Sequence, residues 1–124
     1  MIELLVAATI LAVLSAIGLV SFSSANIRAR DGKRKADLES ARSALELYRS
    51  DIGYYPKNFS LSSASWDSMI TTISGAGYLS STSLQDPKNI DTYVYQFSSN
   101  AAGTTYQVCA YLETTDASYC LDNP

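Results

Sequence analysis

The pattern of hydrophobic positions divides the chain into two unequal parts. Residues 4–22 carry no charged side chain and are apolar on every face of a helix. At 1.5 Å per residue, a helix of this length reaches about 28 Å, close to the hydrocarbon thickness of a bilayer. The run therefore predicts a membrane-spanning helix, or a helix buried as completely inside an assembly.

From Asn26 onward the chain is charged, with no Pro- or Gly-rich linker before it, and its apolar residues become periodic. They recur at intervals of three and four, as on one face of a helix: Leu38, Ala41, Leu45, Tyr48 and Ile52. Gly53, followed by two tyrosines and Pro56, ends the pattern. The simplest prediction is one long helix from about Ile2 to Ile52.

The second half of the chain predicts a short helix and a small sheet. Residues 65–73 have helical spacing, with Ser63 or Ser65 as the N-cap and an apolar stripe of core residues: Trp66, Met69, Ile70 and Ile73. Residues 93–97 and 106–112 read as a hairpin around Gly103, and residues 118–121 as a third strand.

These elements predict an α+β fold, in which one long N-terminal helix packs on a small antiparallel β-sheet head. The first half of the helix is hydrophobic and the second half amphipathic. Residues 1–25 form the membrane or filament-core helix, and residues 26–124 the head. The head comprises the helix 26–52, a loop region 53–90 that contains the helix 65–73, and the hairpin and C-terminal region 91–124.

Composition excludes several classes of function. The net charge is −3 and the isoelectric point about 4.7, which argues against general nucleic-acid binding. The chain has no histidine, so it lacks the residue needed for Ser-His-Asp or Cys-His catalysis and for the usual zinc sites. The remaining residues show no nucleophile–base pair, and we expect no enzymatic activity.

Cys109 and Cys120 are the two cysteines, and they do not form a CxxC motif. Beside a membrane-type segment, their spacing favours one disulfide in an oxidising compartment. Antiparallel pairing of the last two predicted strands would bring them together. The alternative is two unpaired thiols that are buried as small apolar groups.

The basic stretch 28–35 conflicts with an oxidised C-terminal part. Positive charge beside a membrane span usually marks the cytoplasmic side, whereas a disulfide marks the other side. The two agree if a more basic segment once preceded residue 1 and has been removed. Otherwise a solvated helix face accounts for these charges, with i, i+4 pairs such as Lys35–Glu39 and Arg42–Glu46.

Three features of the apolar run concern assembly. Small residues at one-turn intervals, which allow close helix packing, form a row: Ala8, Ala12 and Ala16. Helix propensity is poorest around a serine- and glycine-containing stretch, a candidate soft spot marked by Ser15, Gly18 and Ser21. Glu3 is an acid directly before the apolar run, and in an apolar medium its carboxylate needs a partner of opposite charge.

The sequence IELL at residues 2–5, followed by an unbroken apolar helix, resembles the N-terminus of mature type IV pilins and of the pseudopilins of type II secretion. The resemblance continues through KADLESARSALELYRSDIGYYP at residues 35–56, where members of both groups have a long helix that ends in a similar Gly-x-Tyr-Pro turn. Beyond residue 56 it is looser. The resemblance implies a structural subunit of a type IV pilus-like filament, which polymerises through its hydrophobic N-terminal helix.

The resemblance implies how such a filament would form. Glu3 would neutralise the N-terminal amine of a neighbouring copy, and that amine would be methylated after a prepilin peptidase removes a basic leader. An assembly ATPase and a platform protein would extract the chain from the inner membrane into a homo-oligomeric filament. That filament would be an extracellular pilus serving motility or adhesion, or a periplasmic pseudopilus serving secretion.

The sequence departs from the family pattern at two places and leaves alternatives open. Two further residues normally precede the position of Met1, and many major pilins have a proline near Val20. The first alternative is a major pseudopilin of type II secretion; a single-pass, membrane-anchored binding domain that does not polymerise is an alternative of another class. We expect no cofactor, although pseudopilins often hold calcium and four acids could supply oxygens: Asp86, Asp91, Asp116 and Asp122.

Overall fold

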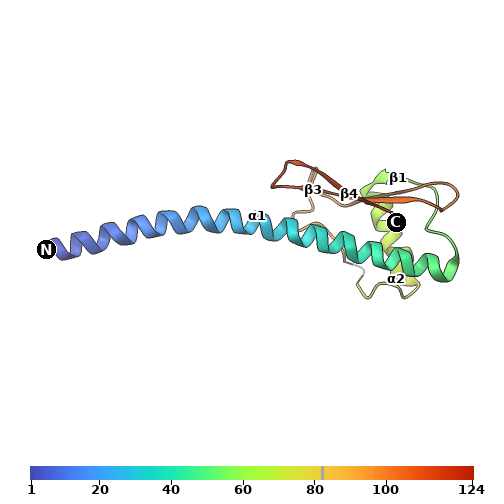
Figure 1. The fold of residues 1–124 in the computed structure, drawn as a ribbon, viewed down its shortest axis with the longest axis horizontal. Helices are drawn as coiled ribbons and strands as arrows, with labels where there is room; N and C mark the ends of the chain where they lie inside the picture. The colour runs from blue at the N-terminus through green and yellow to red at the C-terminus, as the bar shows by residue number, and fades with distance from the viewer. Residues whose placement is uncertain (82) are drawn as a thin grey trace.

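A long helical shaft carries a small head at its C-terminal end in the computed structural model, which describes residues 1–81 and 83–124 (Figure 1). Helix α1, Ile2–Ile52, is unbroken and projects far beyond the head. Its apolar part is long enough to cross a membrane, has a mean hydropathy of 2.5, and is not buried against the rest of the chain. The predicted single helix and its bounds are confirmed.

The second half of α1 packs on the head through the predicted stripe. Leu38, Ala41 and Leu45 are fully buried, and Tyr48 packs at the edge of this core. Ile52, the last residue of the predicted stripe, is 44% exposed and lies outside the core. It is the last residue of α1, where Gly53 turns the chain away with a left-handed φ of 93° and donates its N–H to the Arg49 carbonyl.

The head contains a four-stranded antiparallel sheet in the order β1-β2-β3-β4. The strands are β1 Phe59–Ser62, β2 Gln96–Ser99, β3 Tyr106–Leu112 and β4 Ala117–Asp122. The prediction is confirmed for β3 and, within a residue at each end, for β4. It missed β1, which is short and serine-rich. It also placed β2 too early, since Tyr93 donates its N–H to the Ile90 carbonyl and remains outside the ladder.

Helix α2, Ser63–Gly75, is longer than the predicted 65–73. Its N-cap is Ser62, whose hydroxyl accepts the N–H of Ser65, so the predicted caps are wrong. The predicted core stripe is confirmed, with Trp66, Met69, Ile70 and Ile73 all buried. The Trp66 indole donates to the Leu84 carbonyl and lies edge-on to Tyr95 at a centroid distance of 5.0 Å.

A close backbone approach joins the end of α1 to the β2–β3 turn. The N–H of Tyr55 donates to the carbonyl of Gly103 at 2.9 Å, and the Tyr55 ring packs edge-on against Tyr106 at 4.5 Å. Gly103 has a φ of 68°, and a Cβ there would lie 2.7 Å from the Tyr55 carbonyl oxygen. Only glycine fits this position without a shift of the neighbouring chain.

Candidate assembly site

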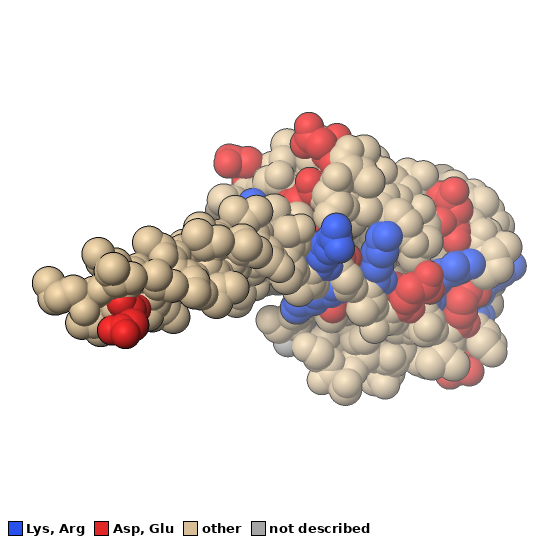
Figure 2. Space-filling model, turned by 60° about the vertical axis from the view of Figure 1, so that its left-hand side comes forward, with Lys and Arg blue, Asp and Glu red and all other residues tan. Residues whose placement is uncertain are grey.

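The N-terminal half of α1 presents apolar side chains to its surroundings on every face. Its large hydrophobic residues are between 51% and 77% exposed, from Val6 at the low end to Ile2 at the high end. Figure 2 shows the shaft as uncharged along nearly all its length, whereas the charged side chains gather on the head. An unpartnered apolar surface of this length needs lipid or other subunits around it.

The predicted assembly residues all lie on this shaft. Glu3 is exposed, and its carboxylate is 3.9 Å from the Met1 ammonium. The small residues Ala8, Ala12 and Ala16 are also exposed and have no neighbour from the head. The soft-spot residues Ser15, Gly18 and Ser21 lie within continuous α-helix, so any loosening there belongs to an assembled state and stays a prediction.

Where the shaft meets the head, a buried cation ties three segments of the chain together. The Arg34 guanidinium is fully buried and donates to Asp86 through Nε at 2.6 Å and Nη2 at 2.9 Å. Its Nη1 donates to Asp31 at 2.7 Å and to Glu113 at 2.8 Å. Arg34 thereby joins α1 to the loop before β2 and to the β3–β4 turn.

The same turn is held by a second set of contacts. The Glu113 carboxylate accepts two hydrogen bonds of 2.7 Å from Arg30 and lies 3.1 Å from the Lys88 ammonium. Asp31 in turn accepts the backbone N–H groups of Glu113 and Thr114, at 3.0 and 2.9 Å, and the Thr114 hydroxyl at 2.7 Å. We call the six charged residues the charge cluster: Arg30, Asp31, Arg34, Asp86, Lys88 and Glu113.

Two acids of the charge cluster, Asp31 and Glu113, have a lowered pKa. Burial raises the pKa of Asp31, but the hydrogen bonds from Glu113 and Thr114 outweigh it and bring that pKa down to about 2. The hydrogen bonds from Arg30 lower the pKa of Glu113 well below its usual range, against the effect of burial. The hydrogen bonds to Asp86 raise the pKa of Arg34 above its usual value.

The charge cluster overturns the prediction of a solvated helix face for Asp31 and Arg34, whereas Arg28, Lys33 and Lys35 are exposed. Arg34 and Asp31 are 0% and 4% exposed. Neither predicted surface pair, Lys35–Glu39 or Arg42–Glu46, is present among the described residues. The pairs found on this part of α1 are instead Lys33–Asp37 at 2.6 Å and Arg42–Glu39 at 3.8 Å. The i, i+3 spacing of Asp31 and Arg34 was a usable signal, whereas nothing local in sequence marks Glu113 as their partner.

The charge cluster also pairs part of the basic stretch 28–35 with carboxylates. Its three cations and three carboxylates balance, and Lys33 pairs with Asp37. Most of the positive charge beside the span is thus neutralised within the head.

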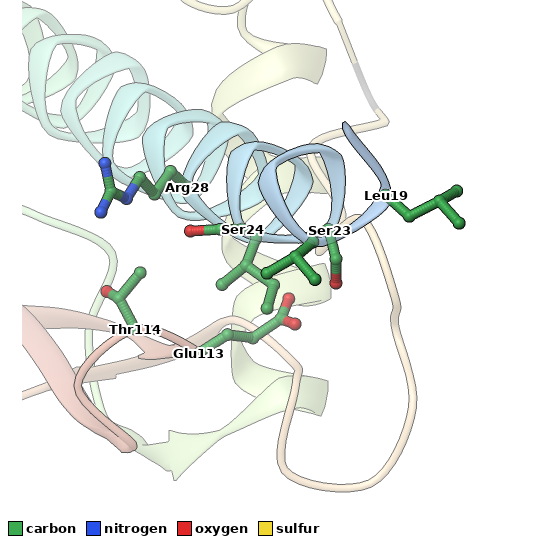
Figure 3. A pocket seen from close by; sticks show the side chains of 8 residues that line it. Leu19, Ser23, Ser24, Arg28, Glu113 and Thr114 are labelled. Atoms are coloured by element: carbon green, nitrogen blue, oxygen red, sulfur yellow. The ribbon is translucent and has the colours of Figure 1, made fainter. Parts of the chain in front are cut away.

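A solvent-open groove of about 770 Å³ lies between α1 and the β3–β4 turn. Its floor on α1 is formed mainly by apolar and small residues, including Leu19, Val20 and Ile27. Figure 3 shows Ser23, Ser24 and Arg28 along this stretch of α1, with Glu113 and Thr114 across from them on the turn. The groove continues the exposed apolar surface of the shaft up to the head.

A covalent bond joins β3 and β4 within their ladder. Cys109 and Cys120 lie opposite each other in the β3–β4 register and form a disulfide, as predicted. The bond braces β4, the edge strand, against the buried strand β3.

The four acids considered for calcium do not converge in the structure. Asp86 is bound by Arg34, Asp116 accepts from the Tyr111 hydroxyl, and Asp122 accepts from the Gln107 amide. Residues 1–81 and 83–124 contain no group of three or more acidic, histidine or cysteine side chains placed to hold a metal ion.

Comparison with known proteins identifies one family. The model of the family described as type II secretion system (T2SS), protein G matches residues 22–116, which is most of the chain. Neither the curated proteins nor the solved structures gave a significant match. Protein G is the major pseudopilin of type II secretion and is related to type IV pilins, in agreement with the long helix and the antiparallel head. The chain belongs to the protein G family of the type II secretion system.

Proposed function

We propose that this chain is the repeating subunit of a pseudopilus, and that it polymerises through the apolar shaft of α1. The observation that carries the proposal is the shaft itself, whose large side chains from Ile2 to Phe22 are more than half exposed. Among the residues that the structure describes, none buries the apolar window of this helix. The role is structural rather than catalytic.

The energetics of the shaft suit a subunit that leaves a membrane for a polymer. Burial of apolar surface contributes about 25 cal/mol per Å², so several hundred Å² per helix correspond to on the order of 10 kcal/mol. Packing among the helices of other copies buries the surface that lipid covered before. The transfer from membrane to filament is then feasible, with the row of Ala8, Ala12 and Ala16 as close-approach points.

The family and the apolar helix indicate anchoring in the inner membrane before assembly. The head would lie in the periplasm, where the Cys109–Cys120 disulfide can form. A prepilin peptidase, an assembly ATPase and a platform protein are the partners that such a system requires. Secretion is the process in which we place the filament.

A longer surface pilus is the second candidate, favoured by the disulfide. Electron microscopy of material sheared from producing cells tests both candidates. Long fibres about 50–80 Å wide, as expected for helices packed 8–10 Å apart inside a shell of heads, would favour the surface pilus. Short filaments that remain with the cell envelope would favour the pseudopilus. Protein that stays monomeric in the membrane would contradict both and favour an anchored binding domain.

A further inference from the structure

Two exposed charges border the apolar part of α1. Glu3 is the only charged side chain among residues 1–27, and Arg28 is the first cation after it. Arg28 is exposed and lines the groove beside the β3–β4 turn. In the described part of the chain, it has no carboxylate within ion-pair distance, unlike Arg30, Lys33 and Arg34.

The surroundings of Arg28 leave one positive charge to be neutralised. The nearest charged groups belong to the charge cluster, in which three cations balance three carboxylates. Glu113 faces the groove, but Arg30, Arg34 and Lys88 already compensate it. Arg28 therefore gives the upper end of the groove a net charge of +1.

We infer that Arg28 of one copy receives Glu3 of a second copy in the filament, an inference that rests on the proposed function. Copies related by a helical operator keep the same polarity, so their α1 helices pack in parallel. A parallel neighbour that is displaced by less than about 25 residues sets Glu3 against uncharged side chains. At a displacement of about 25 residues, or about 37 Å along the helix axis, Glu3 of the neighbour first comes level with a cation, Arg28.

This register also places the N-terminal turn of the second copy at a suitable surface. Its Met1 and Ile2 come level with Asn26 and Ile27, and Ile27 lines the groove. The carboxylate of Glu3 and the guanidinium of Arg28 then satisfy each other away from water, where either alone would be costly. A carboxylate has two acceptor oxygens, so the same Glu3 can also accept a neighbouring ammonium group.

Zero-length carbodiimide crosslinking of filaments tests the register. The Arg28→Lys variant keeps the charge and supplies an amine that the reagent can join to a carboxylate. We expect mass spectrometry to find an isopeptide bond between Glu3 of one copy and position 28 of another. The Lys33–Asp37 pair, at 2.6 Å within one head, serves as the internal control. A bond from Glu3 only to an N-terminal amine or another lysine, or no bond to Glu3, overturns the inference.

Charge reversal gives a second measurement. Arg28→Glu should reduce filament yield at least fivefold relative to Arg28→Lys. Lys35→Glu is the matched control, because Lys35 belongs to the same basic stretch but faces the Tyr119 ring. Equal yields from Arg28→Glu and Lys35→Glu would overturn the inference while leaving the filament itself established. If the unchanged chain forms no filament, the proposed function fails and this inference fails with it.

Discussion

Arg34 and Asp86 are 52 positions apart and form a two-pronged ion pair in which both side chains are fully buried. The pair fixes the loop before β2 against the middle of α1, at the level where the shaft enters the head. Arg34 also reaches the β3–β4 turn through Glu113. One side chain therefore sets the position of two segments of the head on the helix that would carry it into a polymer.

Replacing Arg34 should strongly destabilise the head. Arg34→Leu leaves three buried carboxylates without their shared cation, and the loss of one partner from such a network costs about 3–5 kcal/mol. Arg34→Lys should cost less but remain clearly destabilising, because an ammonium cannot form the fork to Asp86. The single tryptophan, Trp66, is buried and reports unfolding by fluorescence in denaturant.

Lys33→Ala is the matched control for Arg34. Lys33 is the preceding residue of α1, and its exposed pair with Asp37 should contribute only about 0.3–0.5 kcal/mol. Similar losses for Arg34→Leu and Lys33→Ala would show that the buried cluster adds no more than a surface pair.

Acid should destabilise the head over a defined pH range. The pKa of Asp31 is about 2 in the folded chain and about 3.9 in an unfolded one, and the pKa of Glu113 is lowered in the same direction. Groups with a lowered pKa stabilise the fold above their unfolded pKa. The free energy of unfolding should therefore fall as the pH drops from about 4.5 towards 2.

Unfolding experiments at a series of pH values check this expectation. Asp31→Asn should flatten the dependence, whereas Asp67→Asn, at an exposed position of α2, should leave it unchanged. A pH dependence that is identical in all three proteins would rule out Asp31 as a source of acid sensitivity.

The disulfide should contribute measurably to stability. In the chain-entropy model, closing a loop of this size contributes about 3 kcal/mol. The double variant Cys109→Ala with Cys120→Ala avoids burying a hydroxyl at the site of Cys109 and should lose about 2–4 kcal/mol. Intact-mass analysis of the unchanged protein should find no thiol to alkylate before reduction, and two alkylated thiols would refute the bond.

Loss of the Glu3 carboxylate should affect assembly and not the monomer. Glu3→Ala and Glu3→Leu should insert into the membrane and keep the head folded, since no residue of the head contacts Glu3. Filament yield should fall at least tenfold, because the buried partner cation in the neighbouring copy is left unpaired. Thr9→Ala is the control for a polar change on the same shaft. Wild-type yields from both Glu3 variants would contradict the assembly role.

The shaft should loosen around the soft spot when it is packed in a filament. Helix α1 is unbroken in the single chain, but Ser15, Gly18 and Ser21 lie where propensity is lowest. A filament density map should show lengthened i→i−4 bonds there. Gly18→Ala should shorten them, since an added Cβ meets nothing within 4 Å and alanine favours helix by about 1 kcal/mol. Intact bonds through this stretch of the native filament would disprove the idea.

Local sequence patterns predicted the elements that depend on local forces. The 3.6-residue period and Gly53 were enough to bound α1, and the alternation in residues 106–112 was enough to bound β3. The pattern missed β1 because Phe59–Ser62 is a short, serine-rich edge strand whose ladder depends on β2. The boundaries of β2 depended in the same way on its pairing with β3.

By itself the sequence determined the long helix, its apolar and amphipathic halves, the acid Glu3 in its first turn and the cysteine pair. These follow from periodicity, propensity and composition, which act over a few residues. Only the tertiary structure decided that Arg34 and Asp31 are buried, because their partners Asp86 and Glu113 are 52 to 82 positions away. From the sequence alone, a charged residue is expected to be solvated. Only the fold shows whether an opposite charge lies close enough to replace its water.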